Sequence, residues 1–284
     1  MNDSELEEIE LDLLCEAISR RWGYDFRDYA RASLMRRFRD IMMRRGIKQL
    51  SGLIPFILTD EQFFADCLES VSVHVTDMFR DAGFYRSLVE FVFPHLATYP
   101  VLRIWIAGCA TGEEAYSVAI LLQEAGLLAR CRIYATDFNE RVLDVARSGI
   151  YPIDKLGFYE ANYRAAGGRA CFRDYGIEKY AAFAMREGLR AHLTFANHNL
   201  VTDGVFCEMQ LIICRNVLIY FNGRLQNHVI ARCCESLCDL GFLCLGSRES
   251  LRDTETAKLL RPICKPWRIF RKVSSALPSA IHTP

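Results

Sequence analysis

The sequence carries no excess charge of either sign and no apolar run long enough to cross a bilayer. Its 284 residues hold 35 Lys and Arg against 35 Asp and Glu, so net charge offers no general attraction to nucleic acid or to a membrane surface. No apolar run approaches the roughly 18 to 20 residues of a membrane span. The acidic start MNDSELEEIELDLL lacks the basic and then apolar pattern of a secretory signal. These absences predict a cytoplasmic protein that is not inserted in a membrane and does not bind nucleic acid.

The twelve cysteines lack the spacing of a metal site or of a redox pair, because no CxxC occurs in the chain. The densest group, Cys233, Cys234, Cys238 and Cys244, falls on an expected apolar helix and the strand after it. We therefore expect buried free thiols that pack as small hydrophobic side chains, and no bound metal.

The first 95 residues or so have a helical pattern throughout. Ser4 with Glu7 predicts a capping box for a helix that ends near Gly23, and Gly46 is expected to end a second helix, RDYARASLMRRFRDIMMRRG. Further helical patterns follow at LSGLIPFILTD, TDEQFFADCLESV and GFYRSLVEFVFPHL. This region is predicted to be all-α.

From residue 101 onwards, expected strands alternate with expected helices. The strands are LRIWIAG, CRIYATD, LTFANHN, MQLIICRN and GFLCLGS, with helices near 113–126, 139–148 and 222–239. Such alternation predicts a largely parallel sheet covered on both faces. A late strand, PWRIFRKV, is expected at or near a sheet edge, and residues 151–190 interrupt the pattern as an insertion would.

The turn after the first of these strands, GCATGEE, indicates a ligand site. Gly108 and Gly112 would let the backbone approach a ligand beyond the carboxyl ends of the strands. The third glycine of a dinucleotide fingerprint is missing, and two glutamates would repel a pyrophosphate at this helix end. A cationic ligand is favoured, and S-adenosylmethionine carries an ammonium and a sulfonium. Asp137, 25 residues after Gly112, suits ribose hydroxyls, while Glu114 could instead form a capping box with Thr111.

Six ordered blocks carry a resemblance to a known family. They are VTDMFRDAGFYRSL, LRIWIAGCATGEEAYSVAILL, YATDFNERVLDVARSGIYP, LTFANHNL, LIICRNVLIYFN and GFLCLGSRES. The chain resembles the bacterial chemoreceptor glutamate methyltransferases, the CheR family, which are class I S-adenosylmethionine enzymes. The resemblance implies an α/β, Rossmann-like fold with a mostly parallel seven-stranded sheet. Its expected parts are an all-α N-terminal domain (1–72), a linker and helix (73–100), and a methyltransferase domain (101–284) with an inserted β-subdomain at about 151–192.

The resemblance also implies an activity and a set of site residues. The activity is O-methylation of glutamate side chains on a chemoreceptor or a related signalling protein, with S-adenosylhomocysteine as the second product. Arg80 and Tyr220 match the family's residues nearest the transferred methyl group. His74 stands where the family often has an asparagine, which puts its contact with the cofactor in doubt. The implied cofactor contacts are Thr76, Arg80, Glu114, Asp137, Asn199, Leu200, Asn216 and Val217.

This chemistry needs alignment rather than a general base. A glutamate side chain has a reference pKa near 4.3 and is already ionised at neutral pH. The enzyme must hold the reacting atoms at roughly 3 to 3.5 Å and exclude water. An arginine can hold the incoming carboxylate and a tyrosine hydroxyl can orient it, tasks that suit Arg80 and Tyr220. The alternatives are an ion pair of Arg80 with Asp77 or Asp81, and core packing of Tyr220.

Residues 27–48 hold eight basic side chains against two acidic ones, on an otherwise neutral chain. The resemblance makes this the surface that docks on the acidic coiled coil of a chemoreceptor, with a merely solvated face as the alternative. Nucleic acid is disfavoured because stacking aromatics are not interleaved with the arginines. We expect a monomer. The candidate docking residues are Arg36, Arg37, Arg39 and Arg44.

Three rival functions remain at this level. A dehydrogenase is disfavoured by the missing third glycine and the two glutamates. A class I methyltransferase for a small carboxylic acid is a nearer rival, against which the basic helix argues. A non-catalytic regulator that binds the cofactor is disfavoured by the presence of Arg80 and Tyr220.

Overall fold

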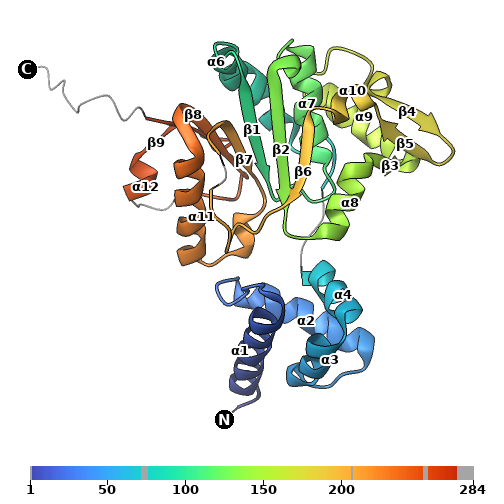
Figure 1. Ribbon diagram of the computed structural model, residues 1–284, viewed down its shortest axis with the longest axis vertical. Coiled ribbons are helices and arrows are strands. Elements are labelled where there is room, and N and C mark those ends of the chain that lie inside the picture. Colours follow the sequence, from blue (N-terminus) through green and yellow to red (C-terminus); the bar gives the residue numbers. More distant parts are fainter. Residues whose placement is uncertain (1, 72–75, 206, 252–254, 274–284) are drawn as a thin grey trace, which may run out of the picture. The chain divides into compact units, whose positions relative to one another are not determined.

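The computed structural model describes residues 2–71, 76–205, 207–251 and 255–273, which form two compact units (Figure 1). A helical unit comprises Met1–Val75 with Ile219–His228, and a sheet unit comprises Thr76–Leu218 with Val229–Pro284. The sequence analysis placed Ile219–His228 in the methyltransferase domain, whereas their contacts group them with the helical unit.

The helical unit is built from short helices whose ends follow local sequence signals. Two helices end at glycines in the left-handed conformation, Gly23 (φ 79°) and Gly46 (φ 67°), as predicted. The capping box of the first helix lies two residues earlier than predicted. Asn2 Oδ1 accepts the Glu5 N–H at 2.8 Å, and Glu5 Oε2 accepts the Asn2 N–H at 3.0 Å. The elements are α1 (Asp3–Trp22), α2 (Arg31–Arg45), η1 (Leu50–Leu53), α3 (Ile54–Thr59) and α4 (Glu61–Val71).

The sheet unit contains a seven-stranded sheet with the order β6-β2-β1-β7-β8-β10-β9. The first five strands in that order run parallel, and β10 runs antiparallel to both of its neighbours. The late strand predicted near an edge is β10, and the edge itself is β9, which the sequence analysis missed. The strand β9 contains Pro262, and a proline argues against a strand when only the sequence is considered. An edge strand nevertheless tolerates proline. The strands are β1 (Leu102–Ala107), β2 (Cys131–Asp137), β6 (Leu193–Asn197), β7 (Met209–Cys214), β8 (Leu237–Leu245), β9 (Leu260–Cys264) and β10 (Ile269–Lys272).

Helices connect these strands in the expected alternation. The linker leads into α5 (Ala82–Ser87), η2 (Leu88–Val92) and α6 (Phe93–Leu96). The later connections are α7 (Glu113–Glu124), η3 (Leu128–Arg130), α8 (Glu140–Ser148), η6 (Leu218–Tyr220), α11 (Gly223–Ser236) and α12 (Glu255–Lys258).

The predicted insertion is a small antiparallel sheet with the order β3-β5-β4 and short helices around it. Glu124 at the end of α7 anchors it, because its Oε1 accepts hydrogen bonds from the hydroxyls of Tyr163 and Tyr175, the latter at 2.8 Å. Burial raises the pKa of both tyrosines, which therefore stay protonated donors. The elements are β3 (Ile150–Pro152), η4 (Ile153–Lys155), α9 (Leu156–Ala165), η5 (Phe172–Tyr175), β4 (Gly176–Lys179), β5 (Ala182–Met185) and α10 (Glu187–Arg190).

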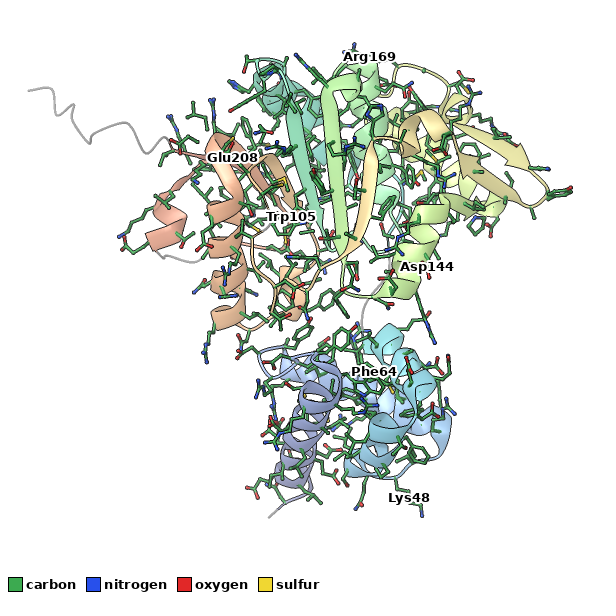
Figure 2. The ribbon with its side chains drawn as sticks, viewed as in Figure 1. Lys48, Phe64, Trp105, Asp144, Arg169 and Glu208 are labelled. Atoms are coloured by element: carbon green, nitrogen blue, oxygen red, sulfur yellow. The ribbon has the colours of Figure 1, made fainter. Side chains whose placement is uncertain are left out.

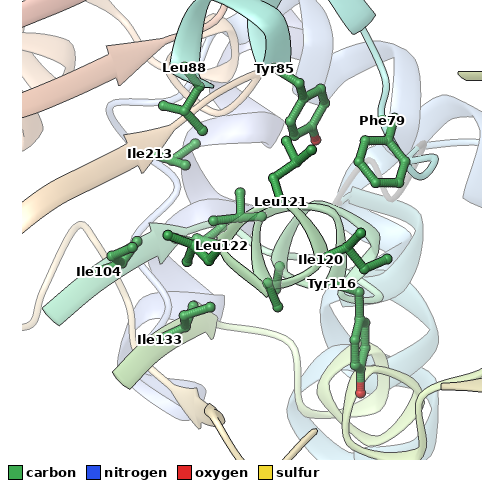
Figure 3. Close-up of a cluster of buried hydrophobic side chains, with 14 of the residues drawn as sticks. Phe79, Tyr85, Leu88, Ile104, Tyr116, Ile120, Leu121, Leu122, Ile133 and Ile213 are labelled. Atoms are coloured by element: carbon green, nitrogen blue, oxygen red, sulfur yellow. The ribbon is translucent and has the colours of Figure 1, made fainter. Parts of the chain in front are cut away.

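The core of the sheet unit surrounds α7. In Figure 3, Leu122 of this helix lies on the side of Ile104 and Ile133 from neighbouring strands, Ile120 lies on the opposite side, and Leu121 belongs to the same cluster. All five are at most 3% exposed. A helix that is apolar on most of its faces belongs in a core, so α7 and its N-terminus are rigidly placed.

Candidate active site

Four neighbouring parallel strands bring most of the predicted cofactor residues to one edge of the sheet. The strands β6, β2, β1 and β7 stand next to each other in that order, so their carboxyl ends share an edge. The strand β1 lies between β2 and β7, where the strand order reverses, and ligands of such sheets bind there. The predicted residues at this edge are Glu114, Asp137, Asn199, Leu200, Asn216 and Val217.

The turn after β1 has a backbone that requires glycine. Gly108 (φ 72°) and Gly112 (φ 93°) both have positive φ, and so does Ala110 between them (φ 47°). A Cβ at Gly108 would lie 2.4 Å from Val217 Cγ2, and one at Gly112 would lie 2.9 Å from Ala146 Cβ. The turn is therefore packed closely on the segments that follow β7 and β2.

Asp137 ends β2 with its carboxylate held by two backbone amides. Oδ2 accepts the Ala110 N–H at 3.0 Å, and Oδ1 accepts the Asn139 N–H at 3.1 Å. The residue is 8% exposed. These two bonds fix the orientation of the Asp137 carboxylate at the end of β2. Trp105 (Figure 2) stiffens the same strand end, since its Nε1–H donates to Thr136 Oγ1 at 2.9 Å.

The two glutamates at the start of α7 have different partners. Glu113 is 3% exposed and accepts the Thr111 hydroxyl at 2.6 Å, and burial raises its pKa. Glu114 Oε1 lies 2.6 Å from Nη1 of Arg215. The capping box expected between Thr111 and Glu114 does not form. The N-cap of α7 is Gly112, which has no side chain to form the cap. Glu114 instead forms an ion pair with the guanidinium of Arg215.

Arg215 is a site residue that the sequence analysis missed. Its side chain is 2% exposed, and its Nη2 lies 2.7 Å from Asp81 Oδ2. Burial works to lower the pKa of this guanidinium, but the charge of Glu114, with smaller contributions from Tyr85 and Asp81, outweighs it and raises the pKa. Arg215 lies in the block LIICRNVLIYFN, which carries part of the family resemblance. Its two acidic partners, however, are more than 100 residues away in the chain.

Glu249 is the second missed residue, and it shapes the turn after β7. Its carboxylate, in a residue 4% exposed, accepts the backbone N–H groups of Gly246 (2.5 Å), Leu218 (2.7 Å) and Asn216 (3.2 Å). Asn216 has a φ of 61°, a conformation that asparagine tolerates better than most residues. Glu249 thereby fixes the backbone on which two predicted cofactor residues stand.

The sequence matches two family descriptions. Residues 9–72 match "CheR methyltransferase, all-alpha domain", and residues 74–263 match "CheR methyltransferase, SAM binding domain". The chain belongs to the CheR methyltransferase family. It is an S-adenosylmethionine-dependent methyltransferase of this type, with the class I fold that the sequence predicted.

Relatives of this CheR methyltransferase match it over most of their length. Cher3 of Pseudomonas putida is 46% identical over 265 residues, which cover 93% of this chain and 97% of its own. "Chemotaxis protein methyltransferase 1" of Vibrio cholerae is 27% identical over 267 residues, covering 90% and 94% respectively. "Chemotaxis protein methyltransferase" of Listeria innocua is 26% identical over 236 residues, covering 82% and 87%.

The residues at the sheet edge fit the cofactor of the CheR family. Asp137 supplies a buried carboxylate at this edge, of the kind that can accept from hydroxyl groups, and Glu114 supplies a second carboxylate, which is paired with Arg215. In the ranges that the structure describes, no group of three or more His, Cys, Asp or Glu could hold a metal ion, and no helix is long and apolar enough to span a membrane.

The linker of this CheR methyltransferase places Thr76 and Arg80, both half-buried, just before α5. Arg80 is flanked by two residues with positive φ, Phe79 (56°) and Asp81 (63°). The sequence left open an ion pair of Arg80 with Asp81. In the structure the Asp81 carboxylate binds Arg215, which would compete with Arg80 for it. His74 lies outside the described residues.

Tyr220 belongs by its contacts to the helical unit. Its carbonyl accepts the Ala30 N–H at 2.8 Å, and the guanidinium carbon of Arg37 lies 6.0 Å from its ring centroid. Arg80 belongs to the sheet unit. The pairing of Arg80 and Tyr220 at the transferred methyl group therefore stays a prediction.

The basic helix α2 is less exposed and less positive than its sequence suggested. Arg37 is half-buried and donates to the Ser70 carbonyl at 3.0 Å, and burial lowers its pKa. Arg39 forms an ion pair with Glu7 of the acidic helix α1. Arg37 thus supports the helical unit rather than offering a free charge. Of the four candidate docking residues, Arg36 and Arg44 remain exposed without an ion pair among the described residues.

Proposed function

We propose that this protein methylates glutamate side chains of a chemoreceptor or a related signalling protein in the cytoplasm, acting as a monomer. The products are glutamate methyl esters and S-adenosylhomocysteine. The main support is that one chain combines both CheR domains and matches proteins named chemotaxis protein methyltransferase over nearly their whole length.

In this proposal some site residues bind the cofactor and others align the substrate carboxylate with it. When bound, S-adenosylmethionine supplies an electrophilic methyl group. Asp137 would accept from the ribose hydroxyls, Glu114 would face the cofactor's ammonium, and Arg80 would hold the substrate carboxylate. Because that carboxylate is already ionised at neutral pH, no base has to remove a proton. The remaining cofactor contacts are proposed at Thr76, Asn199, Leu200, Asn216 and Val217.

Incubation with radiolabelled S-adenosylmethionine and receptor signalling fragments tests this function. We expect label on the fragment that base releases as methanol, as a methyl ester requires. Label on free carboxylic acids, with none on the fragments, would favour a small-molecule methyltransferase. Cofactor binding without any transfer would favour a regulator.

Tyr220→Phe is expected to keep cofactor affinity within about twofold and to lower kcat by about 5- to 30-fold. The reason is the loss of one orienting hydrogen bond, worth about 1 to 2 kcal/mol. Cofactor affinity is measured by calorimetry and kcat by the methyl ester assay. A variant with the full wild-type rate would mean that only the Tyr220 ring matters, as in a core aromatic.

Charge reversal at Arg36 and Arg44 is expected to lower kcat/KM for the receptor fragment by on the order of tenfold at low salt. These charges would attract an acidic partner, and such attraction is screened over about 8 to 10 Å at physiological salt. The wild-type reaction should slow as salt rises, and the double variant should respond less. Arg37 is left unchanged because its reversal would break its bond to Ser70.

The matched control reverses Arg164 and Arg261, two exposed arginines of the sheet unit. Both double variants carry the same change in net charge, so only a local docking role separates them. Thermal melting must first show that each variant folds. If the Arg36 and Arg44 variant matches the control across the salt series, α2 is only a solvated surface.

A further inference from the structure

The backbone around Arg80 is held in a conformation that non-glycine residues rarely adopt. Phe79 and Asp81, on either side of it, have φ values of 56° and 63°. Such residues cost free energy and persist only where the surroundings hold them in place. The same observation points to function, because strained residues cluster at sites that need a fixed geometry.

The N-terminal side of this turn is fastened to α7. Phe79 is fully buried, and its N–H donates to Ser117 Oγ at 2.9 Å. Its ring packs against Tyr85 and Tyr163, with centroid distances of 5.3 and 5.2 Å. These contacts hold Phe79 in place. They do not involve Asp81, on the C-terminal side of the turn, which is held by another residue.

That second anchor is Arg215. Its guanidinium lies 2.7 Å from the Asp81 carboxylate and 2.6 Å from the Glu114 carboxylate, and Phe84 covers it with a ring centroid 4.0 Å from Cζ. A planar guanidinium holds two carboxylates at a fixed spacing, which lysine could not do. Breaking a buried pair of this kind is strongly unfavourable, so the spacing is stiff.

We propose that Arg215 is a positioning residue for methyl transfer. Through Asp81 it fixes the turn that carries Arg80, and through Glu114 it ties that turn to the start of α7, where the cofactor binds. The substrate carboxylate held by Arg80 then meets the methyl group in one geometry. This inference rests on the proposed roles of Arg80 and Glu114.

The charges of Arg215, Asp81 and Glu114 are also compatible with binding a cationic cofactor and an anionic substrate. One guanidinium and two carboxylates sum to a single negative charge (+1 − 2 = −1) when all are ionised. Without Arg215, two carboxylates would face the site and would repel an incoming glutamate side chain. Arg215 therefore leaves enough negative charge for a cationic cofactor and limits repulsion of an anionic substrate.

Asp81→Asn is the informative variant. Asparagine tolerates the left-handed backbone and keeps the side-chain shape, but the ion pair with Arg215 is lost. Asp81 is 34% exposed in its side chain, so the protein should fold, whereas removal of Arg215 would leave the carboxylates of Asp81 and Glu114 without their shared partner. We expect kcat to fall by on the order of tenfold to a hundredfold, since small displacements of an aligning group have effects of that size. Affinity for S-adenosylmethionine should stay within about twofold.

Asp77→Asn is the matched control, because it makes the same chemical change four residues earlier in the same segment. Asp77 pairs loosely with Lys155, whose Nζ lies 3.5 Å from its Oδ1. We expect wild-type kcat in this variant. Equal losses in Asp77→Asn and Asp81→Asn would overturn the positioning role.

A double-mutant cycle with Arg80→Ala tests whether Asp81 acts through Arg80. In the Arg80→Ala background, Asp81→Asn should cost little further rate, because the group that it positions is already gone. A loss as large as in the wild-type background would overturn the inference. If Arg80→Ala itself transfers methyl groups at the wild-type rate, the proposed role of Arg80 fails instead.

Amide hydrogen exchange gives a readout that needs no receptor. The Phe84 N–H donates to the Asp81 carbonyl at 2.7 Å and the Arg80 N–H to the Asp77 carbonyl at 3.3 Å, so both report on the turn. In Asp81→Asn these amides should exchange faster than in the wild type or in Asp77→Asn. Unchanged exchange would mean that Arg215 does not hold the turn, whatever the activity of the protein.

Discussion

Gly108→Ala is expected to lower the free energy of unfolding by about 2 to 5 kcal/mol and to weaken cofactor binding. A side chain at φ 72° costs about 1 to 2 kcal/mol, and overpacking costs about 1 to 3 kcal/mol more. The overpacking arises because the new Cβ would lie 2.4 Å from Val217 Cγ2. Denaturant unfolding measures the stability, and calorimetry the binding of S-adenosylmethionine.

Two further variants separate the contributions. Gly126→Ala has a similar φ of 69° but no atom within 4 Å of the new Cβ, so it should show only the backbone cost. Val217→Ala combined with Gly108→Ala removes the clashing methyl group and should recover the packing part. Equal destabilisation in Gly108→Ala and Gly126→Ala would show that close packing on Val217 does not matter.

Asp137→Ala is expected to weaken binding of S-adenosylmethionine and of S-adenosylhomocysteine by about 5- to 150-fold. This corresponds to about 1 to 3 kcal/mol for the loss of a charged acceptor. The variant also leaves the Ala110 N–H without its carboxylate partner, so some loss of stability is expected as well. Asp137→Asn should have a smaller effect, since it keeps one acceptor oxygen. Calorimetry on each folded variant measures the affinities.

The control for Asp137 is Asp144→Ala, which removes a carboxylate from the exposed face of α8, where the side chain is 71% exposed. It should bind the cofactor like the wild type. Unchanged affinity in Asp137→Ala would exclude Asp137 from the cofactor site and would leave it as a backbone anchor for the turn.

Much of the fold was predictable because its signals are local. Gly23 and Gly46 end their helices where expected, since only a glycine enters the left-handed conformation cheaply. The strands that gather the site have runs of apolar residues that a buried parallel sheet requires. The edge strand β9 was missed because it is short and contains Pro262, and the α1 cap was displaced because Asn2 with Glu5 offers the same pattern as Ser4 with Glu7.

The sequence by itself determined the family, the order of the elements and the sheet edge at which Gly108 and Asp137 meet. Only the tertiary structure decided the partners of the charged groups. Glu114 pairs with a residue 101 positions away and Asp81 with the same residue 134 positions away, while Arg37 turns inward to the Ser70 carbonyl. Periodicity and capping depend on neighbours within a few residues, whereas an ion pair depends on which distant side chains folding brings within about 3 Å.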